Sequence, residues 1–300
     1  MVIETFNLTK QYAGQGGCRD VTITVAPGQV FGFLGPNGAG KSTLVKTLVG
    51  LLHPTSGKAL VLGKSLGSRE SRSKIGFLPE QFRYHEWLSG RELLAFHGQL
   101  YQMEPKEIRL RIPEVLEVVG LRGAEDKKVG SYSKGMQQRI GIACALMNKP
   151  RLIFLDEPTS ALDPLGRREV RKIIQNLKEQ GTTVFLNSHL LSEVEMVCDH
   201  VAIINKGKIV TSGMLNELLG KKLQVRLEVA GLTPALLEEL SKLGTVKERQ
   251  ENILWIDVDS KEKLPLLTRR IIEGGGQLYA LQSQQHSLED LFIKIVEEER

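Results

Sequence analysis

The chain has 300 residues, of which 41% are hydrophobic and 25% are charged, and its formal net charge is +5. This composition is typical of a globular protein with room for one large domain and a smaller one. No apolar run approaches the ~18–20 residues of a membrane span, and residues 1–10 (MVIETFNLTK) do not resemble a signal peptide. We therefore expect a cytosolic chain that reaches a membrane only through a partner.

The charged residues and cysteines exclude further classes of function. Residues 1–220 hold 28 Lys/Arg against 21 Asp/Glu, and residues 221–300 hold 12 against 14. The first part is mildly basic, which fits a triphosphate ligand or an anionic membrane face, but no Lys/Arg block predicts nucleic-acid binding. Cys18, Cys144 and Cys198 lack metal-ligand spacing, so we expect buried, reduced thiols.

A glycine-rich segment follows an early apolar run. Residues 30–34 (VFGFL) have the pattern of a buried strand, and a helical pattern extends after the glycines up to Pro54. Residues 35–43 (GPNGAGKST) match G-x-x-x-x-G-K-[ST], whose backbone N–H groups bind phosphate. Lys41 is expected to contact the β- and γ-phosphates, and Ser42 to ligate Mg²⁺. The predicted nucleotide contacts in this segment are Gly35, Pro36, Asn37, Gly38, Ala39, Gly40, Lys41, Ser42 and Thr43.

The next part of the chain has helical patterns. Residues 91–101 (RELLAFHGQLY) and 107–121 (EIRLRIPEVLEVVGL) are amphipathic at helical spacing, without a strand pattern between them. They predict a helical subdomain over about residues 87–135, with residues 132–139 (YSKGMQQR) at its far end.

Two more buried strands are predicted at residues 152–155 (LIFL) and 183–186 (TVFL), with a helical pattern between them. This βαβ order predicts an α/β domain. Asp156 ends the first strand, where a carboxylate can hold Mg²⁺, and Glu157 beside it can orient the attacking water. His189 follows the second strand, where an imidazole can bridge the γ-phosphate and the catalytic carboxylate. A solvated turn is the alternative for the two acids.

The pattern changes near residue 220. Residues 223–229 (LQVRLEV) alternate strictly, as a half-buried strand does. Helix, strand, helix and strand patterns follow at residues 234–243, 252–258, 264–272 and 277–282. Ser287 and Asp290 can form a capping box before a last helix. We expect a small α+β domain of the ferredoxin-like kind over residues 221–300.

These motifs, in this order, resemble those of the nucleotide-binding subunit of an ATP-binding cassette (ABC) transporter over residues 1–220. Residues 35–43 are similar to its Walker A motif, residues 152–156 to its Walker B motif, and residues 160–163 (SALD) to its D-loop. The single residues that resemble family positions are Tyr12 (adenine stacking), Glu157 (catalytic glutamate), Asp163 (D-loop) and His189 (switch histidine). The resemblance implies a P-loop NTPase core that binds ATP with Mg²⁺ and hydrolyses it.

Residues 132–137 (YSKGMQ) are similar to the family signature LSGGQQ. The resemblance implies that two cassettes, expected as a homodimer, sandwich two ATP molecules head to tail. Ser133 and Gly135 of one subunit would then complete the γ-phosphate site of the other, as a hydroxyl and a backbone N–H at a helix N-terminus can. Lys134 replaces a glycine and Met136 a glutamine, so Lys134 would add a cation near the phosphates or pair with an acid.

Residues 75–81 (IGFLPEQ) depart from the family's Q-loop. By register its glutamine falls on Glu80, with Gln81 one place later, so a carboxylate would face the metal. We expect Glu80→Gln to weaken Mg²⁺ dependence only mildly, whereas loss of metal-dependent turnover on Gln81 substitution alone would place the register on Gln81. Residues 82–87 (FRYHEW) are expected to dock a membrane subunit, with packing on their own domain as the alternative.

The leading functional interpretation is an ATPase subunit that dimerises on ATP and powers a separate transmembrane permease of an exporter. Such a chain would lie on the inner face of the cell membrane, held by the permease, without binding nucleic acid. The alternatives are a soluble ABC ATPase acting on ribosomes or DNA, an importer ATPase, and a regulatory module with negligible turnover. Residues 221–300 resemble the small appendix of some exporter ATPases, for which dimer support or regulation is expected.

Overall fold

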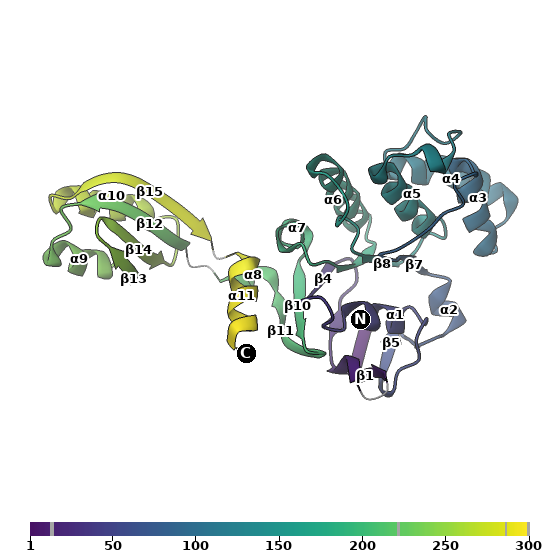
Figure 1. The fold of residues 1–300 in the computed structure, drawn as a ribbon, viewed down its shortest axis with the longest axis horizontal. Coiled ribbons are helices and arrows are strands. Elements are labelled where there is room, and N and C mark those ends of the chain that lie inside the picture. Colours follow the sequence, from purple (N-terminus) through teal and green to yellow (C-terminus); the bar gives the residue numbers. More distant parts are fainter. Residues whose placement is uncertain (13–14, 221–222, 286, 299–300) are drawn as a thin grey trace. The chain divides into compact units, whose positions relative to one another are not determined.

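The computed structural model describes residues 1–12, 15–220, 223–285 and 287–298, drawn as a ribbon in Figure 1. The chain divides into two compact units, Met1–Leu215 and Asn216–Arg300. The division falls within a short helix, α8 (Leu215–Leu219). None of the helices in the described ranges is both long enough and apolar enough to span a bilayer.

A six-stranded sheet runs through the larger unit in the order β11-β10-β4-β9-β8-β7. Its strands are β4 (Val30–Leu34), β7 (Ile75–Leu78), β8 (Leu152–Asp156), β9 (Thr183–Asn187), β10 (His200–Asn205) and β11 (Lys208–Met214). All neighbours are parallel except β11, which is antiparallel to β10. Every residue of β4, β8 and β9 is buried, as their continuous apolar runs predict for a sheet covered on both faces. These three predicted strands are confirmed.

An antiparallel sheet that the sequence analysis did not predict packs beneath the six-stranded sheet in Figure 1. Its strands are β1 (Ile3–Tyr12), β2 (Gln15–Val21), β3 (Thr24–Val25), β5 (Ser56–Val61) and β6 (Lys64–Ser65). Helix α1 (Lys41–Leu48) contacts strands of both sheets and so lies between them. The core here contains four fully buried rings, Phe31, Phe33, Phe154 and Phe185.

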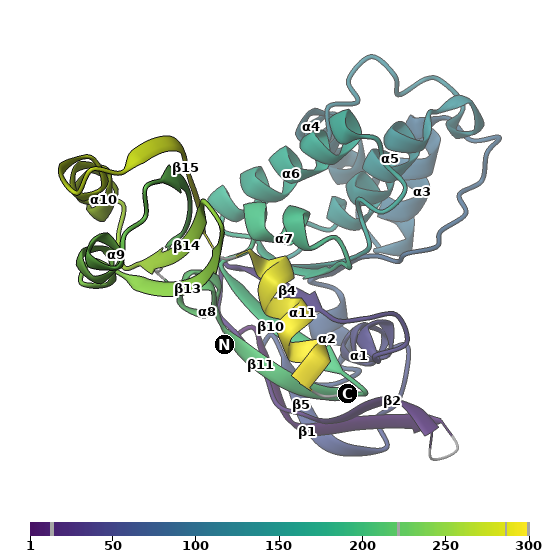
Figure 2. The ribbon, with the colours of Figure 1, turned by 60° about the vertical axis from the view of Figure 1, so that its left-hand side comes forward.

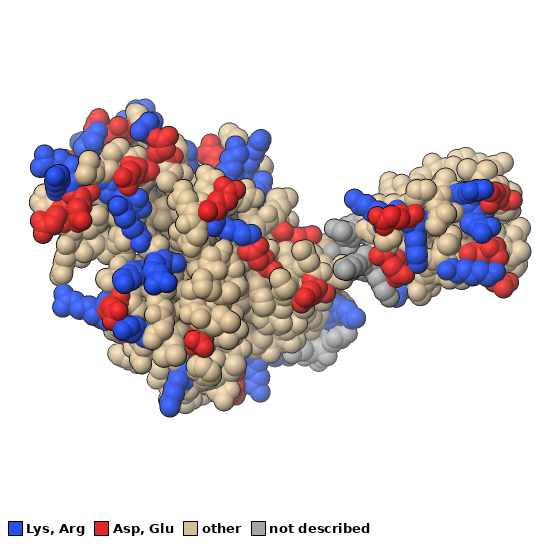
Figure 3. Space-filling model, turned by 180° about the vertical axis from the view of Figure 1, so that it is seen from behind, with Lys and Arg blue, Asp and Glu red and all other residues tan. Residues whose placement is uncertain are grey.

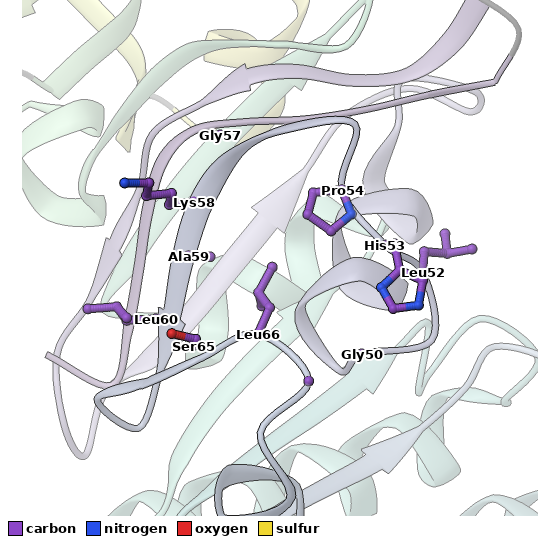
Figure 4. A pocket seen from close by; sticks show the side chains of 11 residues that line it. Gly50, Leu52, His53, Pro54, Gly57, Lys58, Ala59, Leu60, Ser65 and Leu66 are labelled. Atoms are coloured by element: carbon purple, nitrogen blue, oxygen red, sulfur yellow. The ribbon is translucent and has the colours of Figure 1, made fainter.

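The helix after the glycine-rich segment is shorter than predicted. It ends at Leu48 and does not continue to Pro54. Gly50 has a φ of +81°, and the Leu51 N–H donates to the Lys46 carbonyl at 2.8 Å. This is the usual way in which a glycine in the left-handed conformation ends a helix. The segment after Gly50 then borders a cavity of about 320 Å³ against β5 and β6, shown in Figure 4.

The opposite face of the six-stranded sheet carries helices. Helix α5 (Lys134–Leu146) contacts β7, α6 (Pro164–Glu179) contacts β9, and α7 (Leu191–Val197) contacts β4. The two amphipathic segments are confirmed as helices α3 (Gly90–Leu100) and α4 (Pro105–Val118). Both pack against α5, and the three helices lie together in Figures 1 and 2. The short helix α2 (Arg69–Arg72) precedes β7.

Gly141 of α5 allows the segment after β7 to pack very closely. A Cβ at this position would lie 2.8 Å from Leu78 Cδ1 and 3.0 Å from the Tyr84 hydroxyl oxygen. Burial raises the pKa of the Tyr84 hydroxyl, and the nearby thiol of Cys144, one turn further along the same helix, adds to this effect. Cys144 is a free, buried cysteine, and so are Cys18 and Cys198, as expected from their spacing. Helix α5 therefore holds the segment that leads from β7 past Glu80.

The smaller unit contains a four-stranded antiparallel sheet in the order β13-β14-β12-β15. Its elements are β12 (Leu223–Ala230), α9 (Pro234–Ser241), β13 (Thr245–Gln250), β14 (Ile253–Val258), α10 (Lys263–Glu273) and β15 (Gln277–Gln285). This βαββαβ order is the ferredoxin-like one. Strand β12 alternates between buried and half-buried residues, as its sequence predicts. Strand β13 was not predicted, because its sequence TVKERQ is mostly polar and its residues are mostly exposed.

The last helix, α11 (Leu288–Glu298), begins at the predicted capping box. The Ser287 hydroxyl accepts a hydrogen bond from the Asp290 N–H at 3.1 Å, and the Asp290 carboxylate accepts one from the Ser287 N–H at 2.9 Å. The pairing is confirmed, with Asp in place of the more common Glu or Gln.

We expect Gly141→Ala to lower the free energy of unfolding by about 1–3 kcal/mol, because the new methyl group overpacks Leu78 and Tyr84. Chemical denaturation measures this change. Gly135→Ala on the same helix is the matched control, since a Cβ there meets no atom within 4 Å. Equal destabilisation by both substitutions would contradict the close packing.

Candidate nucleotide-binding site

Four adjacent strands of the parallel sheet end at one edge, and each is followed by polar residues. The glycine-rich loop follows β4, Glu80 follows β7, Asp156 and Glu157 come at the end of β8, and His189 follows β9. Parallel strands present their carboxyl ends at the same edge of a sheet, which is where open α/β sheets bind ligands.

A cavity of about 320 Å³ lies at this edge, within the size range of small-molecule sites. It is lined by Gly17, Asn37, Gly38, Gly40, Lys41, Ser42, Thr43, Glu80, Glu157 and His189. We call it the P-loop cavity. It brings together residues from the glycine-rich loop, the Glu80 segment and the ends of β8 and β9. Glu80 lines the cavity whereas Gln81 does not, and Gly17 of β2 is a lining residue that the sequence analysis missed.

Close backbone contacts hold the glycine-rich loop in place. A Cβ at Gly40 would lie 2.2 Å from the Gly17 carbonyl oxygen, and one at Gly35 would lie 2.3 Å from the Ile204 carbonyl oxygen. Gly40 also has a φ of +102°, which residues with a side chain rarely adopt. The loop thus requires glycine at both positions because β2 and β10 approach it so closely.

Lys41 provides the positive charge of the P-loop cavity. Its ammonium group donates hydrogen bonds to the carbonyl oxygens of Gly35 at 2.8 Å and Pro36 at 3.3 Å. Burial lowers the pKa of Lys41, and nearby carboxylates oppose this effect. These carboxylates are, in decreasing order of effect, Glu157, Asp156 and Glu80.

Asp156 is almost completely buried at the end of β8. Burial raises its pKa, while a hydrogen bond donated by the Asn187 side-chain amide lowers it. The Asn187 side-chain oxygen is buried and has no hydrogen-bond partner in the described part of the chain. The sequence analysis missed Asn187, although it ends β9 two residues before His189.

The oxygen atoms at this edge suit a hard divalent cation. They come from the Ser42 hydroxyl, from the carboxylates of Asp156 and Glu80, and from the unpartnered Asn187 side-chain oxygen. Among the described residues, no group of three or more His, Cys, Asp or Glu side chains could hold a metal ion by itself. A cation such as Mg²⁺ commonly binds in this way, with one or two carboxylates and the substrate phosphates as ligands.

Glu157 and His189 form a pair at the wall of the P-loop cavity. The Glu157 carboxylate lies 2.7 Å from His189 Nδ1, and an ionised carboxylate can only accept a hydrogen bond. Glu157 is buried and has a φ of +53°, a conformation that few residues other than glycine adopt. Such backbone strain is common at functional sites. The His189 ring remains 46% exposed.

A second hollow, of about 400 Å³, lies where α5 and α6 begin. It is lined by Ser133, Lys134, Gly135, Arg139, Ala161, Leu162, Asp163, Leu165, Gly166 and Glu169. Ser133 caps α5 and Asp163 caps α6, through hydrogen bonds from the N–H groups of Met136 at 3.3 Å and Gly166 at 2.7 Å. We call it the signature hollow. Within the described ranges, none of its residues also lines the P-loop cavity.

Arg139 holds the signature hollow together, a role that the sequence analysis did not assign. Its guanidinium group donates to the carbonyl oxygens of Val119 at 3.2 Å and Gly120 at 3.0 Å, at the end of α4. The same group pairs with Glu169 of α6 at 3.2 Å. Arg139 therefore connects α4, α5 and α6 around the hollow.

Tyr12 lies at the end of β1 and is 48% exposed. The Lys10 ammonium lies 5.6 Å from the centre of its ring. Tyr12 is not among the residues that line the P-loop cavity, and residues 13–14 beside it are outside the described ranges. Stacking of Tyr12 on adenine therefore stays a prediction.

The sequence profile of the family described as ABC transporter matches residues 18–160. An ABC transporter ATP-binding protein of Nostoc sp. strain PCC 7120 is 48% identical over 72% of this chain and 64% of the relative's own length. Another, from Synechocystis sp. strain PCC 6803, is 39% identical over 99% of this chain and 85% of the relative. The bacitracin transport ATP-binding protein BcrA of Bacillus licheniformis is 36% identical over 98% of this chain and 97% of BcrA.

Solved structures agree with these matches. An ATP-binding subunit of an ABC transporter has 30% sequence identity and a TM-score of 0.66, over 73% of this chain and 92% of that one. The ATP-binding cassette MJ0796, solved as a dimer with ADP and phosphate in a post-hydrolysis state, has 26% identity and a TM-score of 0.63. That match covers 71% of this chain and 99% of MJ0796. The chain therefore belongs to the ATP-binding proteins of ABC transporters, which bind and hydrolyse ATP.

Proposed function

We propose that two copies of this chain close head to tail around two ATP molecules and thereby drive a separate membrane permease. The observation that carries this proposal is the separation of the P-loop cavity from the signature hollow. One ATP would contact Lys41 and Ser42 of one copy, and Ser133 and Gly135 of the other. The N-terminus of α5 presents a hydroxyl and free N–H groups, which suit a γ-phosphate.

Mg²⁺ would be held by the Ser42 hydroxyl, by Asp156, in part through water, and by Glu80. When bound, this ion would neutralise charge on the phosphates. The all-oxygen donor set supports the assignment, because Mg²⁺ prefers oxygen ligands. The buried Asn187 amide would keep the Asp156 carboxylate oriented toward the ion.

Glu157 would orient the attacking water and accept its proton. A general base must lie within hydrogen-bond reach of the proton it takes, and the Glu157 carboxylate lines the cavity beside Lys41. His189 would position that carboxylate through their 2.7 Å contact and approach the γ-phosphate itself. Glu157 and His189 follow the neighbouring strands β8 and β9 at the same edge of the sheet, and this proximity supports the two proposed roles.

The permease would dock on an aromatic surface that we define as His85, Trp87 and Phe96. Trp87 is 68% exposed. The centre of the His85 ring lies 4.7 Å from the ring centre of Trp87 and 5.9 Å from that of Phe96. Tyr84, by contrast, packs on α5, so residues 82–87 combine a part anchored on the chain's own domain with an exposed part. An exposed aromatic group of this kind is typical of an interaction site. Docking there would place the chain on the inner face of the cell membrane.

Export is the proposed direction of transport, and residues 221–300 are proposed to support or regulate the dimer. The similarity to BcrA, whose name describes bacitracin transport, extends over nearly the whole chain, including residues 221–300. On the face shown in Figure 3, Lys and Arg side chains are interspersed with Asp and Glu. This mixture gives no support to a nucleic-acid partner, which requires a basic patch.

We expect Glu157→Gln to leave ATP binding intact, to slow ATP turnover by at least ~10²-fold because water is no longer activated, and to stabilise an ATP-bound dimer. Phosphate release and gel filtration with ATP measure these effects. Glu179→Gln, an exposed change at the end of α6, is the charge-matched control. Wild-type turnover in Glu157→Gln would remove this residue from the proposed mechanism.

We expect Ser133→Arg to block the ATP-dependent dimer while each monomer still binds ATP, because the bulky cation fills the place of the neighbour's γ-phosphate. Ser131→Arg, the same change two residues earlier and outside the signature hollow, should dimerise as the wild type does. Sedimentation with and without ATP distinguishes them. Normal dimers of Ser133→Arg would argue against the head-to-tail arrangement.

We expect Trp87→Ala to reduce the amount of membrane protein that co-purifies with this chain from detergent extracts. The melting temperature should stay close to that of the wild type, because the side chain is mostly exposed. Tyr279→Ala removes an aromatic side chain of similar exposure, 67%, from the smaller unit. Equal co-purification with both variants would contradict the proposed docking surface.

A further inference from the structure

Glu80 adds a carboxylate to the cavity in which, by the proposed function, the triphosphate of ATP binds. It lines the P-loop cavity beside Lys41 and Glu157. Glu80 is exposed, and its side chain has no hydrogen bond or ion pair within the described ranges. The charge of Glu80 is therefore not neutralised by a partner of its own.

The charges around the P-loop cavity are unbalanced. Among the described lining residues, the one ammonium group, that of Lys41, stands with two carboxylates, those of Glu80 and Glu157. The Asp156 carboxylate acts on Lys41 from outside the lining, and Lys46 acts on Asp156 in turn. A triphosphate that enters the cavity meets more negative than positive side-chain charge. A triphosphate carries several negative charges, so the Glu80 carboxylate, although screened by solvent at this exposed position, should weaken the binding of a bare triphosphate.

A divalent cation reverses the sign of this interaction. Carboxylate oxygens are preferred ligands of such ions, and a bound ion of this kind is often the largest local charge in a site. Without the cation, the Glu80 carboxylate interacts only with the negative phosphates; with the cation present, it also interacts with a positive charge. The same side chain then favours the bound state that it opposed before.

We propose that Glu80 makes ATP binding conditional on a divalent cation, by repelling the bare triphosphate and by binding the cation that accompanies it. The inference rests on the proposed nucleotide site and adds to it a residue that discriminates between free and metal-bound ATP. Turnover still requires the cation without Glu80, because Ser42 and Asp156 remain, so the mild loss of Mg²⁺ dependence expected from the sequence applies to turnover and the larger loss to ATP binding. The effect of Glu80 therefore appears in binding, before hydrolysis.

The test is the affinity for ATP of the full-length chain, measured by calorimetry in EDTA and again in excess Mg²⁺. The quantity of interest is the ratio of the two dissociation constants. We expect Glu80→Gln to lower this ratio by at least about tenfold, equivalent to about 1.4 kcal/mol, mainly through tighter binding in EDTA. Glu86→Gln removes the same charge from the same exposed loop but outside the cavity, and should leave the ratio within about twofold of wild type.

A second variant, Glu80→Ala, separates lost repulsion from any new hydrogen bond made by the glutamine amide. It should also tighten binding in EDTA, since it removes the charge without adding a donor. An unchanged ratio in Glu80→Gln, or tightening in Glu80→Gln but not in Glu80→Ala, would overturn the inference. Failure of the wild type to bind ATP even with Mg²⁺ would instead overturn the proposed site.

Discussion

The parallel pairing of β8, β9 and β4 is the constraint on which the rest of this structure depends. These strands are buried at every residue, so covering layers are needed on both faces of the sheet. Helix α1 with the antiparallel sheet provides one layer, and the helices from α5 to α7 provide the other. The strands' carboxyl ends then meet at one edge, and this places Lys41, Glu157 and His189 around one cavity.

Helix α5 connects the signature hollow with the Glu80 segment, which lines the P-loop cavity. Its N-terminus carries Ser133 in the signature hollow, and its middle holds the segment of Glu80 through the contact of Gly141 with Tyr84. A change of the Glu80 segment on nucleotide binding would therefore act on the same helix that carries Ser133 in the signature hollow. Arg139 adds a connection from α5 to α6 through its ion pair with Glu169.

The sequence located the segments that end at the P-loop cavity well, because each is a short segment next to a buried strand, while their catalytic roles stay predictions. It predicted fewer elements correctly where their formation depends on contacts between residues far apart in the chain. The helix after the glycine-rich loop ends early, since Gly50 permits a local turn that the apolar pattern does not reveal. The antiparallel sheet and β13 were missed, because their half-exposed strands lack a continuous apolar run. Gly17 and Asn187 were missed as well, since neither belongs to a recognisable motif.

The sequence by itself determined the chemistry of this protein. A glycine-rich loop with Lys41, a carboxylate pair after an apolar strand, and a serine at a helix start are local features, and local features can be recognised in one dimension. Only the tertiary structure decided which groups share a cavity. It placed Glu80 and not Gln81 beside Lys41, and it kept Ser133 out of the lining of the P-loop cavity. These placements follow from strand order and helix packing, which bring together or separate segments that are far apart in the chain.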